Sequence, residues 1–440
     1  MDAFEYFKGK RITVMGLGLL GGVGDIAYLA ENGAEIIATD LKSQEELQPS
    51  LDVLARFPHI TYTLGRHELS DFQDRDLIIK APSTPLDSIY IAEARKNGIP
   101  ITMWAALFAS FAEEAGATIV GVTGTRGKTT TTSMISAILQ TAGKHVIEGG
   151  NIQGTSVLPQ LARVTFDTVA VLELDSWKLQ GFGEGGISPH VAVFTTFYPD
   201  HMNYYKDNLD QYLSDKANIF LAQGEGDTLI LGKQCAPTLI EKYGERIESK
   251  TLVVDESKLP DEWTLRIPGM HNRYNAALAL TAARTLMIPD AVSRMALESF
   301  AGVPGRLEFR GEKGGVKIYN DTTSTTPEAT LAALSALDPA RIVLIMGGTD
   351  KNLGMDVLLQ KLSEVKKVIL LAGSGTERIR SELPGAPVFD SLSGAVTEAF
   401  AHAEGGDALL FSPAFTSFGM FKNEYDRGDQ FNLLVQKYGN

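Results

Sequence analysis

Short apolar runs alternate with longer amphipathic stretches along almost the whole chain. The runs are rich in β-branched residues, and most are followed by glycine or polar residues before helical spacing begins. Strands that alternate with helices predict an α/β fold with largely parallel sheets. The predicted strands cover residues 11–16, 35–40, 77–81, 99–103, 117–121, 169–174, 191–195, 316–319, 342–346, 368–372 and 408–411.

These runs fall into three blocks, which predict three domains. The chain has 440 residues, long for one domain and sufficient for three that each bury a core. We expect boundaries near residues 106 and 302, the second just before Val303. The predicted domains are therefore residues 1–106, 107–302 and 303–440.

The most specific local pattern lies in residues 121–130, with the sequence GVTGTRGKTT. An apolar run leads into it and a helical pattern follows, so backbone N–H groups and a helix N-terminus can surround phosphate. Lys128 can reach the β- and γ-phosphates, and the Thr129 hydroxyl can bind Mg²⁺. The spacing is a shortened variant of the Walker motif, because Val122 stands where the first glycine is usual. The alternative is a structural glycine-rich turn; the predicted ATP-binding loop is Gly124, Thr125, Arg126, Gly127, Lys128, Thr129 and Thr130.

A second nucleotide signal lies near the N-terminus. Gly16, Gly18 and Gly21 form a G-x-G-x-x-G pattern after a strand, and Asp40 ends the next strand. Alone, this pattern predicts a dinucleotide fold and an NAD-dependent dehydrogenase. A chain that uses both NAD and a phosphate loop would be unusual, so we favour a different nucleotide in the same crevice. A purely structural turn remains the third interpretation.

Three titratable residues of the central block are candidates for chemistry. Glu173 ends the apolar strand 169–174, where a carboxylate is positioned to hold Mg²⁺ against phosphates. An ordinary strand-end charge is its alternative. His201 lies in a polar loop and Lys216 in a helix-like stretch. Taken singly, the histidine is more simply structural and the lysine solvated.

Three further polar residues flank the last boundary. Asn272 begins an alanine-rich helical stretch and is most simply an N-cap, although its amide could recognise a nucleotide. Arg306 and Asp321 lie where the central and last blocks meet. An arginine there could neutralise a transferring phosphoryl group. Neither residue has an assignment without further context.

Composition narrows the classes of function. Lys and Arg number 40 against 54 Asp and Glu, a net charge of −14, which disfavours nonspecific nucleic-acid binding. The longest apolar stretch, residues 101–112, is too short for a bilayer, so we expect no membrane insertion. Cys235 is the only cysteine, and no basic region followed by an apolar one opens the chain. These features predict a cytoplasmic protein.

The ordered set of motifs resembles the Mur ligase family over nearly the entire chain. The motifs are Gly-Leu-Gly at 16–18, Thr-Gly-Thr-x-Gly-Lys-Thr at 123–129, Gly-Asn-Ile at 150–152, Leu-Glu-Leu-Asp-Ser at 172–176, Asp-His-Met at 200–202, His-Asn-x-x-Asn at 271–275, Gly-Arg at 305–306, Asn-Asp at 320–321, Ser-Pro-Ala at 412–414 and Phe-Lys-Asn at 421–423. The resemblance implies a Rossmann-like UDP-binding domain, a central phosphate-loop ATPase domain and a C-terminal dinucleotide-fold domain for the incoming amino acid.

The resemblance also implies a role for each matched residue. The implied UDP-substrate contacts are Leu19, Leu20 and Asp40 at the uracil-ribose end, with Asn151 and His201 nearer the muramoyl part. The implied Mg²⁺ ligands are Thr129 and Glu173 for one ion, His201 and a carbamylated Lys216 for the other. The implied ATP contacts are Asn272, Arg306 and Asp321, and the implied amino-acid contacts are Thr325, Lys351 and Ser417.

The implied activity is an ATP-dependent ligase that adds glutamate, D-glutamate above all, to UDP-N-acetylmuramoyl-L-alanine through an acyl phosphate. We expect it to act as a monomer. Several positions depart from the family pattern: Thr323 replaces a lysine, Glu424 an aromatic residue, residues 177–178 the usual Phe-Gln, and residues 80–83 a Ser-Pro-Gly turn. They leave open L-glutamate as the added amino acid, or another ligase of the same fold that is directed at alanine, a diamino acid or a folate. The more distant alternatives are the dehydrogenase and a noncatalytic nucleotide-binding module.

Overall fold

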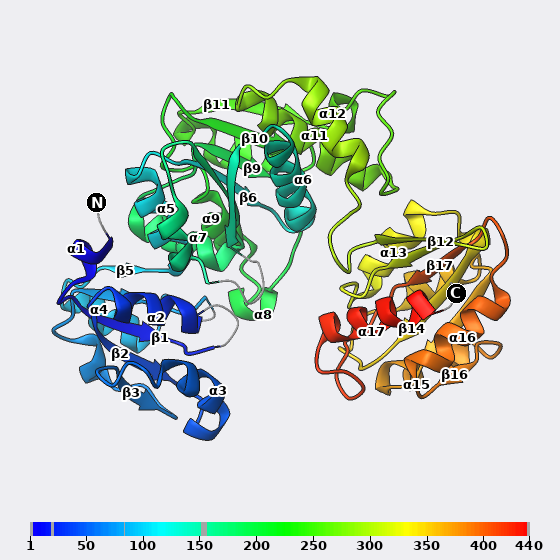
Figure 1. Cartoon of the computed structure of the whole chain (residues 1–440), viewed down its shortest axis with the longest axis horizontal. Helices are drawn as coiled ribbons and strands as arrows, with labels where there is room; N and C mark the ends of the chain where they lie inside the picture. Colours follow the sequence, from blue (N-terminus) through cyan, green and yellow to red (C-terminus); the bar gives the residue numbers. More distant parts are fainter. Residues whose placement is uncertain (1–2, 19–21, 83, 151–155, 438–440) are drawn as a thin grey trace. The chain divides into compact units, whose positions relative to one another are not determined.

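The computed structural model describes residues 3–18, 22–82, 84–150 and 156–437. They form two compact units, the first with residues 1–260 and 274–296 and the second with residues 261–273 and 297–440. Two sheets belong to the first unit and one to the second (Figure 1), which confirms the predicted α/β class and its three sheets. The boundaries near residues 106 and 302 stay predictions.

The first sheet has five parallel strands in the order β3-β2-β1-β4-β5. Its strands are β1 Arg11–Met15, β2 Glu35–Asp40, β3 Thr61–Leu64, β4 Leu77–Ile79 and β5 Ile101–Thr102. Its helices are α1 Ala3–Phe7, α2 Gly22–Glu31, α3 Gln44–Leu54 and α4 Ile89–Lys96, with a 3₁₀ turn η1 Leu69–Phe72. The strand order reverses direction between β1 and β4, and ligands of such sheets bind outside the carboxyl ends at this switch point.

The second sheet has six parallel strands in the order β11-β10-β9-β6-β8-β7. Its strands are β6 Thr118–Thr123, β7 His145–Gly150, β8 Thr168–Glu173, β9 Val191–Phe194, β10 Thr228–Gly232 and β11 Lys250–Val254. Its helices are α5 Trp104–Glu114, α6 Lys128–Thr141, α7 Ser176–Gly185, α8 Met202–Tyr205, α9 Leu209–Ala217, α10 Ala236–Tyr243, α11 Met270–Thr285 and α12 Asp290–Ser299. The 3₁₀ turns are η2 Leu158–Arg163, η3 Gly244–Arg246 and η4 Glu256–Lys258. Figure 1 shows α5 and α6 on opposite sides of β6, so helices cover both faces.

The third sheet lies in the second unit, in the order β12-β13-β17-β14-β15-β16. Only the pair β12-β13 is antiparallel. Its strands are β12 Glu308–Lys313, β13 Val316–Asn320, β14 Ile342–Gly347, β15 Lys367–Leu371, β16 Val388–Phe389 and β17 Ala408–Phe411. Its helices are α13 Pro327–Ala336, α14 Asp356–Leu362, α15 Ser374–Ile379, α16 Leu392–His402 and α17 Glu424–Lys437, with turns η5 Pro339–Arg341 and η6 Arg380–Glu382.

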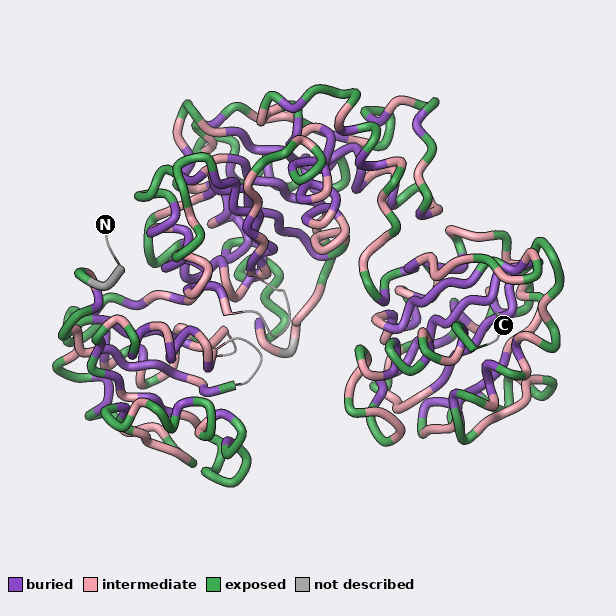
Figure 2. The backbone as a smooth tube through the Cα atoms, viewed as in Figure 1, coloured by how far each residue is buried: buried purple, intermediate pink, exposed green. Residues whose placement is uncertain are grey.

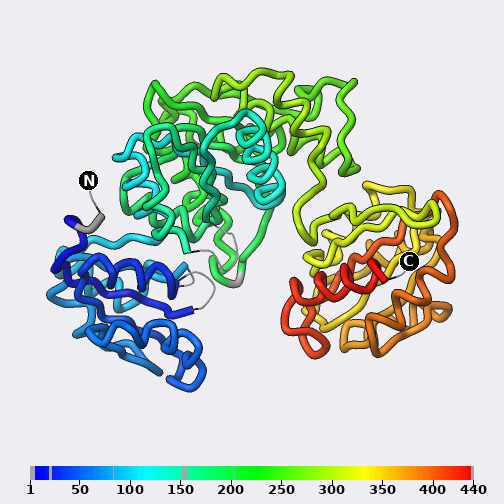
Figure 3. Tube along the Cα trace, viewed as in Figure 1, coloured from blue at the N-terminus to red at the C-terminus, as the bar shows by residue number. Residues whose placement is uncertain are grey.

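Burial follows the sheets closely. One continuous apolar core runs through both sheets of the first unit, from Phe7 to Tyr243, and two clusters cover the two faces of the third sheet. In Figure 2 the strands are mostly purple, whereas exposed green segments gather on the helices and loops. The colour gradient of Figure 3 follows the chain from the blue first sheet into the cyan and green second sheet.

None of the helices in the described ranges combines the length and apolar character needed to cross a membrane.

A buried carboxyl group joins the first two sheets. Asp25, on α2, is 2% exposed, and its Oδ1 accepts a hydrogen bond of 2.7 Å from the backbone N–H of Leu158. Burial raises the pKa of Asp25 to about 7, although the backbone N–H groups of Val157 and Leu158 favour the charged form. The folded chain therefore binds a proton that the unfolded chain releases near pH 4.

This raised pKa makes stability depend on pH. The contribution of protonated Asp25 is fully present below about pH 4 and is lost as pH rises through about 7. We therefore expect Asp25→Asn, which keeps a carbonyl acceptor for Leu158, to gain stability relative to wild type as pH rises across this window. Denaturant unfolding of the wild type and of Asp25→Asn at several pH values measures the difference between their free energies of unfolding. A difference that stays constant with pH would contradict the raised pKa of Asp25.

Candidate active site

The loop between β6 and α6 has the conformation that the sequence pattern predicts. Gly124 has φ +139° and Gly127, which precedes the first turn of α6, has φ +86°. A Cβ atom would lie 2.0 Å from Thr195 Oγ1 at the first position and 2.5 Å from Asn275 Oδ1 at the second. Both positions therefore require glycine, for backbone conformation and for space.

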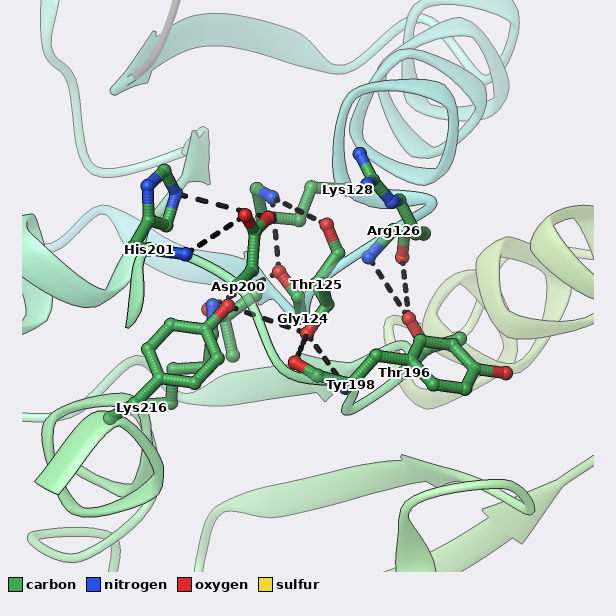
Figure 4. Close-up of polar contacts among 11 residues, drawn as sticks. Gly124, Thr125, Arg126, Lys128, Thr196, Tyr198, Asp200, His201 and Lys216 are labelled. Atoms are coloured by element: carbon green, nitrogen blue, oxygen red, sulfur yellow. Dashed lines mark hydrogen bonds and ion pairs between the residues drawn. The ribbon is translucent and has the colours of Figure 1, made fainter. Parts of the chain in front are cut away.

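This loop is held in place by hydrogen bonds that it donates to residues 196–198, the segment that follows β9. The backbone N–H of Thr125 donates to Thr196 O (2.7 Å), and the N–H of Arg126 donates to Thr196 Oγ1 (2.9 Å). The Thr125 hydroxyl donates to Tyr198 O (3.0 Å). Figure 4 shows these contacts from the loop to the segment beneath it. The loop is preorganised, and Thr129 and Thr130 follow in the first turn of α6.

Two lysines converge on the carbonyl oxygen of Gly124. Lys128 Nζ donates to Gly124 O (3.0 Å) and Thr125 O (3.3 Å), and Lys216 Nζ donates to Gly124 O (3.0 Å). Figure 4 shows both ammonium groups directed at the loop. Two like charges this close to one another favour an anion between them or the loss of one proton.

Lys216 is the more deeply buried of the two lysines. It lies in the last turn of α9, is 1% exposed, and stands over the ring of Tyr212 at 4.9 Å. Burial, then the charge of Lys128, lower the pKa of Lys216 well below its ordinary value. The interpretation of Lys216 as a solvated lysine is therefore wrong, because the fold brings α9 against the phosphate loop.

Glu173 ends β8, directly beside the strand that leads into the loop. Its register partner is Val122 in β6, and its side chain is 3% exposed. The carboxyl ends of parallel strands lie at one edge of the sheet, so Glu173 shares that edge with the loop. Next to it, Asp175 caps α7 and pairs with Lys178 at 2.8 Å. Burial raises the pKa of Asp175, but Lys178 outweighs it and the net shift is downward.

His201 occupies a left-handed backbone position, with φ +55°, at the start of α8. Its ring packs against the ring of Trp177, with centroids 4.6 Å apart, and its Nε2 lies 3.9 Å from Asp200 Oδ2. Burial lowers the pKa of His201, so its imidazole is neutral near pH 7 and can bind a metal ion. Trp177 was not among the predicted site residues, because only the fold reveals that it supports His201.

The donor set around the loop suits a hard cation with phosphate. The Glu173 carboxylate and the Thr129 hydroxyl are oxygen donors, which Mg²⁺ prefers together with phosphate oxygens and water. Among the residues that the structure describes, no group of three His, Cys, Asp or Glu side chains could hold a metal ion alone.

At the first sheet, Asp40 ends β2, which lies next to β1. Its Oδ2 accepts a hydrogen bond from the N–H of Leu17 (2.8 Å) and its Oδ1 one from the N–H of Lys42 (2.9 Å), which joins the loops after β1 and β2. The other predicted contacts of the UDP-linked substrate, Leu19, Leu20 and Asn151, lie outside the described residues.

The predicted nucleotide contacts Asn272, Arg306 and Asp321 belong to the second unit. Asn272 is the third residue of α11 and its amide donates to Pro268 O (2.7 Å), so the N-cap interpretation is wrong. Arg306 is exposed in a turn closed by its N–H to Val303 O (3.0 Å). Asp321 is buried and accepts hydrogen bonds from Leu307 N (2.8 Å), Ser324 Oγ and Ser412 Oγ. Burial raises the pKa of Asp321 to about 6, against the effect of these donors and of Arg306.

The three predicted amino-acid contacts also lie in the second unit. Lys351 Nζ donates to Thr325 Oγ1 at 3.1 Å, so the fold brings these two together. Ser417 is buried and follows Thr416, which pairs with Thr349 through two backbone hydrogen bonds of 3.0 and 3.1 Å. All three residues therefore follow, or lie near, the carboxyl ends of β13, β14 and β17.

Comparison with known families matches three successive segments of the chain. They are the Mur ligase MurD-like N-terminal domain at residues 10–103, the Mur ligase middle domain at 122–258 and the Mur ligase glutamate ligase domain at 305–415. The N-terminal glycine pattern therefore falls within a Mur ligase domain, which removes the reason for a dehydrogenase.

Full-length relatives and solved structures agree with these matches. UDP-N-acetylmuramoylalanine--D-glutamate ligases from Roseiflexus sp. (strain RS-1) and Borreliella afzelii (strain PKo) are 36% and 35% identical, covering 98% and 99% of this chain and 99% of each relative. The MurF ligase of Thermotoga maritima in complex with ADP has the same fold, with a TM-score of 0.60, 19% identity and full coverage of both chains. The chain belongs to the Mur ligase family, with an N-terminal domain of the MurD-like type.

Proposed function

We propose that this chain is an ATP-dependent ligase that joins D-glutamate to UDP-N-acetylmuramoyl-L-alanine in peptidoglycan precursor synthesis. The observation that carries the proposal is the convergence of Lys128 and Lys216 on the glycine-rich loop at Gly124, within a chain whose relatives are D-glutamate ligases. The proposed domains are residues 1–106 for the UDP-linked substrate, 107–302 for ATP and 303–440 for the amino acid.

In the proposed reaction the alanyl carboxylate attacks the γ-phosphate of ATP, and ADP leaves. The glutamate amine then attacks the carbonyl carbon of the acyl phosphate, phosphate leaves, and the amine gives up a proton. Gly124 and Gly127 are proposed to contribute loop N–H groups, while Thr125 and Arg126 hold the loop in place through Thr196. Lys128 is proposed to stabilise the negative charge, first on the γ-phosphate and then on the leaving group. Asn272, Arg306 and Asp321 of the second unit are proposed to bind the nucleotide.

Magnesium is proposed as the cofactor, held by Thr129 and Glu173 at one position and by His201 and modified Lys216 at the other. It would supply charge stabilisation to the phosphates. Lys216 is a suitable amine for carbamylation because burial favours its neutral form, which attacks carbon dioxide to give a carbamate and a proton. The carbamate replaces a cation with oxygen ligands of the kind that Mg²⁺ prefers.

Substrate contacts are proposed on the same grounds. Asp40, with Leu19 and Leu20, binds the uracil-ribose end, and Asn151 with His201 binds the muramoyl part. Thr325, Lys351 and Ser417 bind the carboxylates of glutamate, where the Lys351 ammonium supplies the positive charge. The proposal places the enzyme in the cytoplasm, where ATP is available, and has it act as a monomer.

The amino acid that the enzyme accepts is the sharpest test. With UDP-N-acetylmuramoyl-L-alanine and ATP present, we expect phosphate release with D-glutamate at least about tenfold faster than with L-glutamate or a diamino acid. The reason is that Thr325, Lys351 and Ser417 must meet two carboxylates in one handed arrangement. A phosphate-release assay across the panel measures it.

Thr323 stands where the family pattern has a lysine, and this departure left the identity of the added amino acid open. The panel of amino acids therefore tests it directly. Release with L-glutamate or a diamino acid but none with D-glutamate would overturn the substrate assignment and leave the ligase chemistry standing. Omission of the UDP-linked substrate is the control, and it should reduce phosphate release to background with every amino acid.

A further inference from the structure

Lys80 is a fully buried lysine between the two sheets of the first unit. It follows β4 directly and is 1% exposed. Its backbone N–H donates to Thr102 O at 3.0 Å, at the start of the connection to α5. A buried ammonium is costly unless hydrogen bonds and opposite charges compensate it, so such a residue is unusual without a specific role.

Its hydrogen bonds go to a turn at the edge of the first sheet. Lys80 Nζ donates to Ala81 O (3.2 Å) and Thr84 O (3.0 Å), and the N–H of Thr84 closes the turn onto Ala81 O (3.1 Å). This turn follows β4, the strand next to β1, and therefore lies at the switch point where a nucleotide-linked substrate binds.

The opposite charge comes from the second sheet. Burial lowers the pKa of Lys80 to about 8, and the carboxylates that oppose this effect are Asp215, then Asp175, then Glu184. The lysine therefore stays charged near pH 7. Packing brings the two sides together: α7 lies against β5, whose Thr102 accepts from the Lys80 N–H, and Gln180 of α7 donates to Asp215 (2.6 Å).

Asp215 is held rigidly in the last turn of α9, next to Lys216. It is 5% exposed, and its carboxylate accepts hydrogen bonds from Gln180 Nε2 (2.6 Å), Tyr205 Oη (3.0 Å) and Gln211 Nε2 (2.9 Å). Three donors from α7, α8 and α9 fix its orientation. A displacement of this carboxylate would therefore shift the turn that places Lys216 against the phosphate loop.

We propose that Lys80 is a positioning residue that couples the turn at Ala81 and Thr84 to Asp215, so that binding of the UDP-linked substrate and the placement of Lys216 depend on one another. The inference rests on the proposed ligase function and deepens it. The hydrogen bonds of Lys80 hold the turn at Ala81 and Thr84, and its positive charge attracts the Asp215 carboxylate on the side of the second sheet. Neither an uncharged side chain nor an exposed lysine can do both.

The test replaces Lys80 with methionine, which keeps the length and removes the charge. We expect KM for the UDP-linked substrate to rise about tenfold and kcat to fall, while KM for ATP changes less than about twofold. Equilibrium binding of UDP to the two purified chains gives a second readout that does not need turnover. Lys206→Met is the matched control, because Lys206 pairs with Asp87 across the same two sheets but is exposed.

A double-mutant cycle with Asp215→Asn tests the coupling itself. If the two charges act together, Lys80→Met should cost about tenfold in kcat/KM in the wild-type background but less than about threefold in the Asp215→Asn background. Lys80→Gln, which can still donate to one carbonyl, serves as a second variant if Lys80→Met does not fold. It should show the same loss of coupling with a smaller rise in KM.

The outcomes separate this inference from the proposed function. Additive effects in the cycle, an equal rise of KM for all substrates, or an unchanged KM for the UDP-linked substrate would each overturn the role of Lys80. Absence of phosphate release by the wild-type chain with D-glutamate would instead overturn the proposed function. Equal thermal unfolding temperatures of wild type and variant exclude a loss of fold as the cause of a selective rise in KM.

Discussion

Replacing Lys128 with alanine should lower kcat for ATP-dependent phosphate release by about 10²–10³-fold, the loss typical of removing one donor from a charge-stabilising site. The Lys128 ammonium already lies within hydrogen-bonding distance of the Gly124 and Thr125 carbonyls, at the inner side of the loop. It is therefore positioned to exchange these weak acceptors for phosphate oxygens. A phosphate-release assay with saturating substrates measures the effect on turnover.

Lys144→Ala is the matched control, because Lys144 is exposed just beyond the opposite end of the same helix, α6. It should leave turnover and ATP affinity unchanged. If the Lys128→Ala variant turned over ATP at the wild-type rate, the loop would not act on the γ-phosphate. The ligase proposal would then lose its chemical basis, although the family assignment would stand.

The phosphate loop was predictable because its information is local. Gly124 and Gly127 have positive φ, and glycines at these positions between a strand and a helix are visible in the sequence. Their second requirement, space, depends on Thr195 and Asn275 and was not predictable from the local pattern. A glycine with positive φ is likewise visible at the C-terminal end of α6, where Gly143 has φ +72° and follows the cap residue. Local patterns of this kind translate directly into backbone geometry.

Lys216 and Lys80 could not be recognised as buried from sequence, since each depends on the packing of separate elements. Lys216 becomes buried only when α9 packs against the loop after β6, 92 positions earlier in the chain. Lys80 is buried between two sheets, although its sequence neighbours suggested an ordinary turn. For the same reason Trp177 was missed, because its contact is the ring of His201 and not a neighbour in sequence.

Asn272 shows a different limit of sequence patterns. An asparagine at the start of a helical stretch predicts an N-cap, yet α11 begins at Met270 and the amide donates to Pro268 O. Helix boundaries shift by one or two residues without any change in the apolar pattern, so the capping residue is easily misplaced. The resemblance to the family assigned Asn272 a ligand role independently of this error.

Replacing Lys216 with methionine should reduce turnover by about 10²–10³-fold while ATP binding changes little, because the loss is of charge stabilisation and not of the phosphate loop. Burial and the nearby Lys128 lower the pKa of Lys216, which favours the neutral amine that carbamate formation requires. With isotopically labelled bicarbonate, NMR should show one carbamate signal in the wild type at pH 7 and none in the variant.

Lys242→Met provides the comparison, because Lys242 lies on the neighbouring helix α10 and pairs with Asp210 near the surface. It should keep both the carbamate signal and full turnover, since its side chain pairs with Asp210 and not with the loop. A carbamate signal that persists in Lys216→Met would assign the modification to another lysine. Full turnover without any signal in the wild type would instead mean that Lys216 acts as a neutral amine, positioned by Gly124 O and by Tyr212, and the proposed oxygen ligand would have to be abandoned.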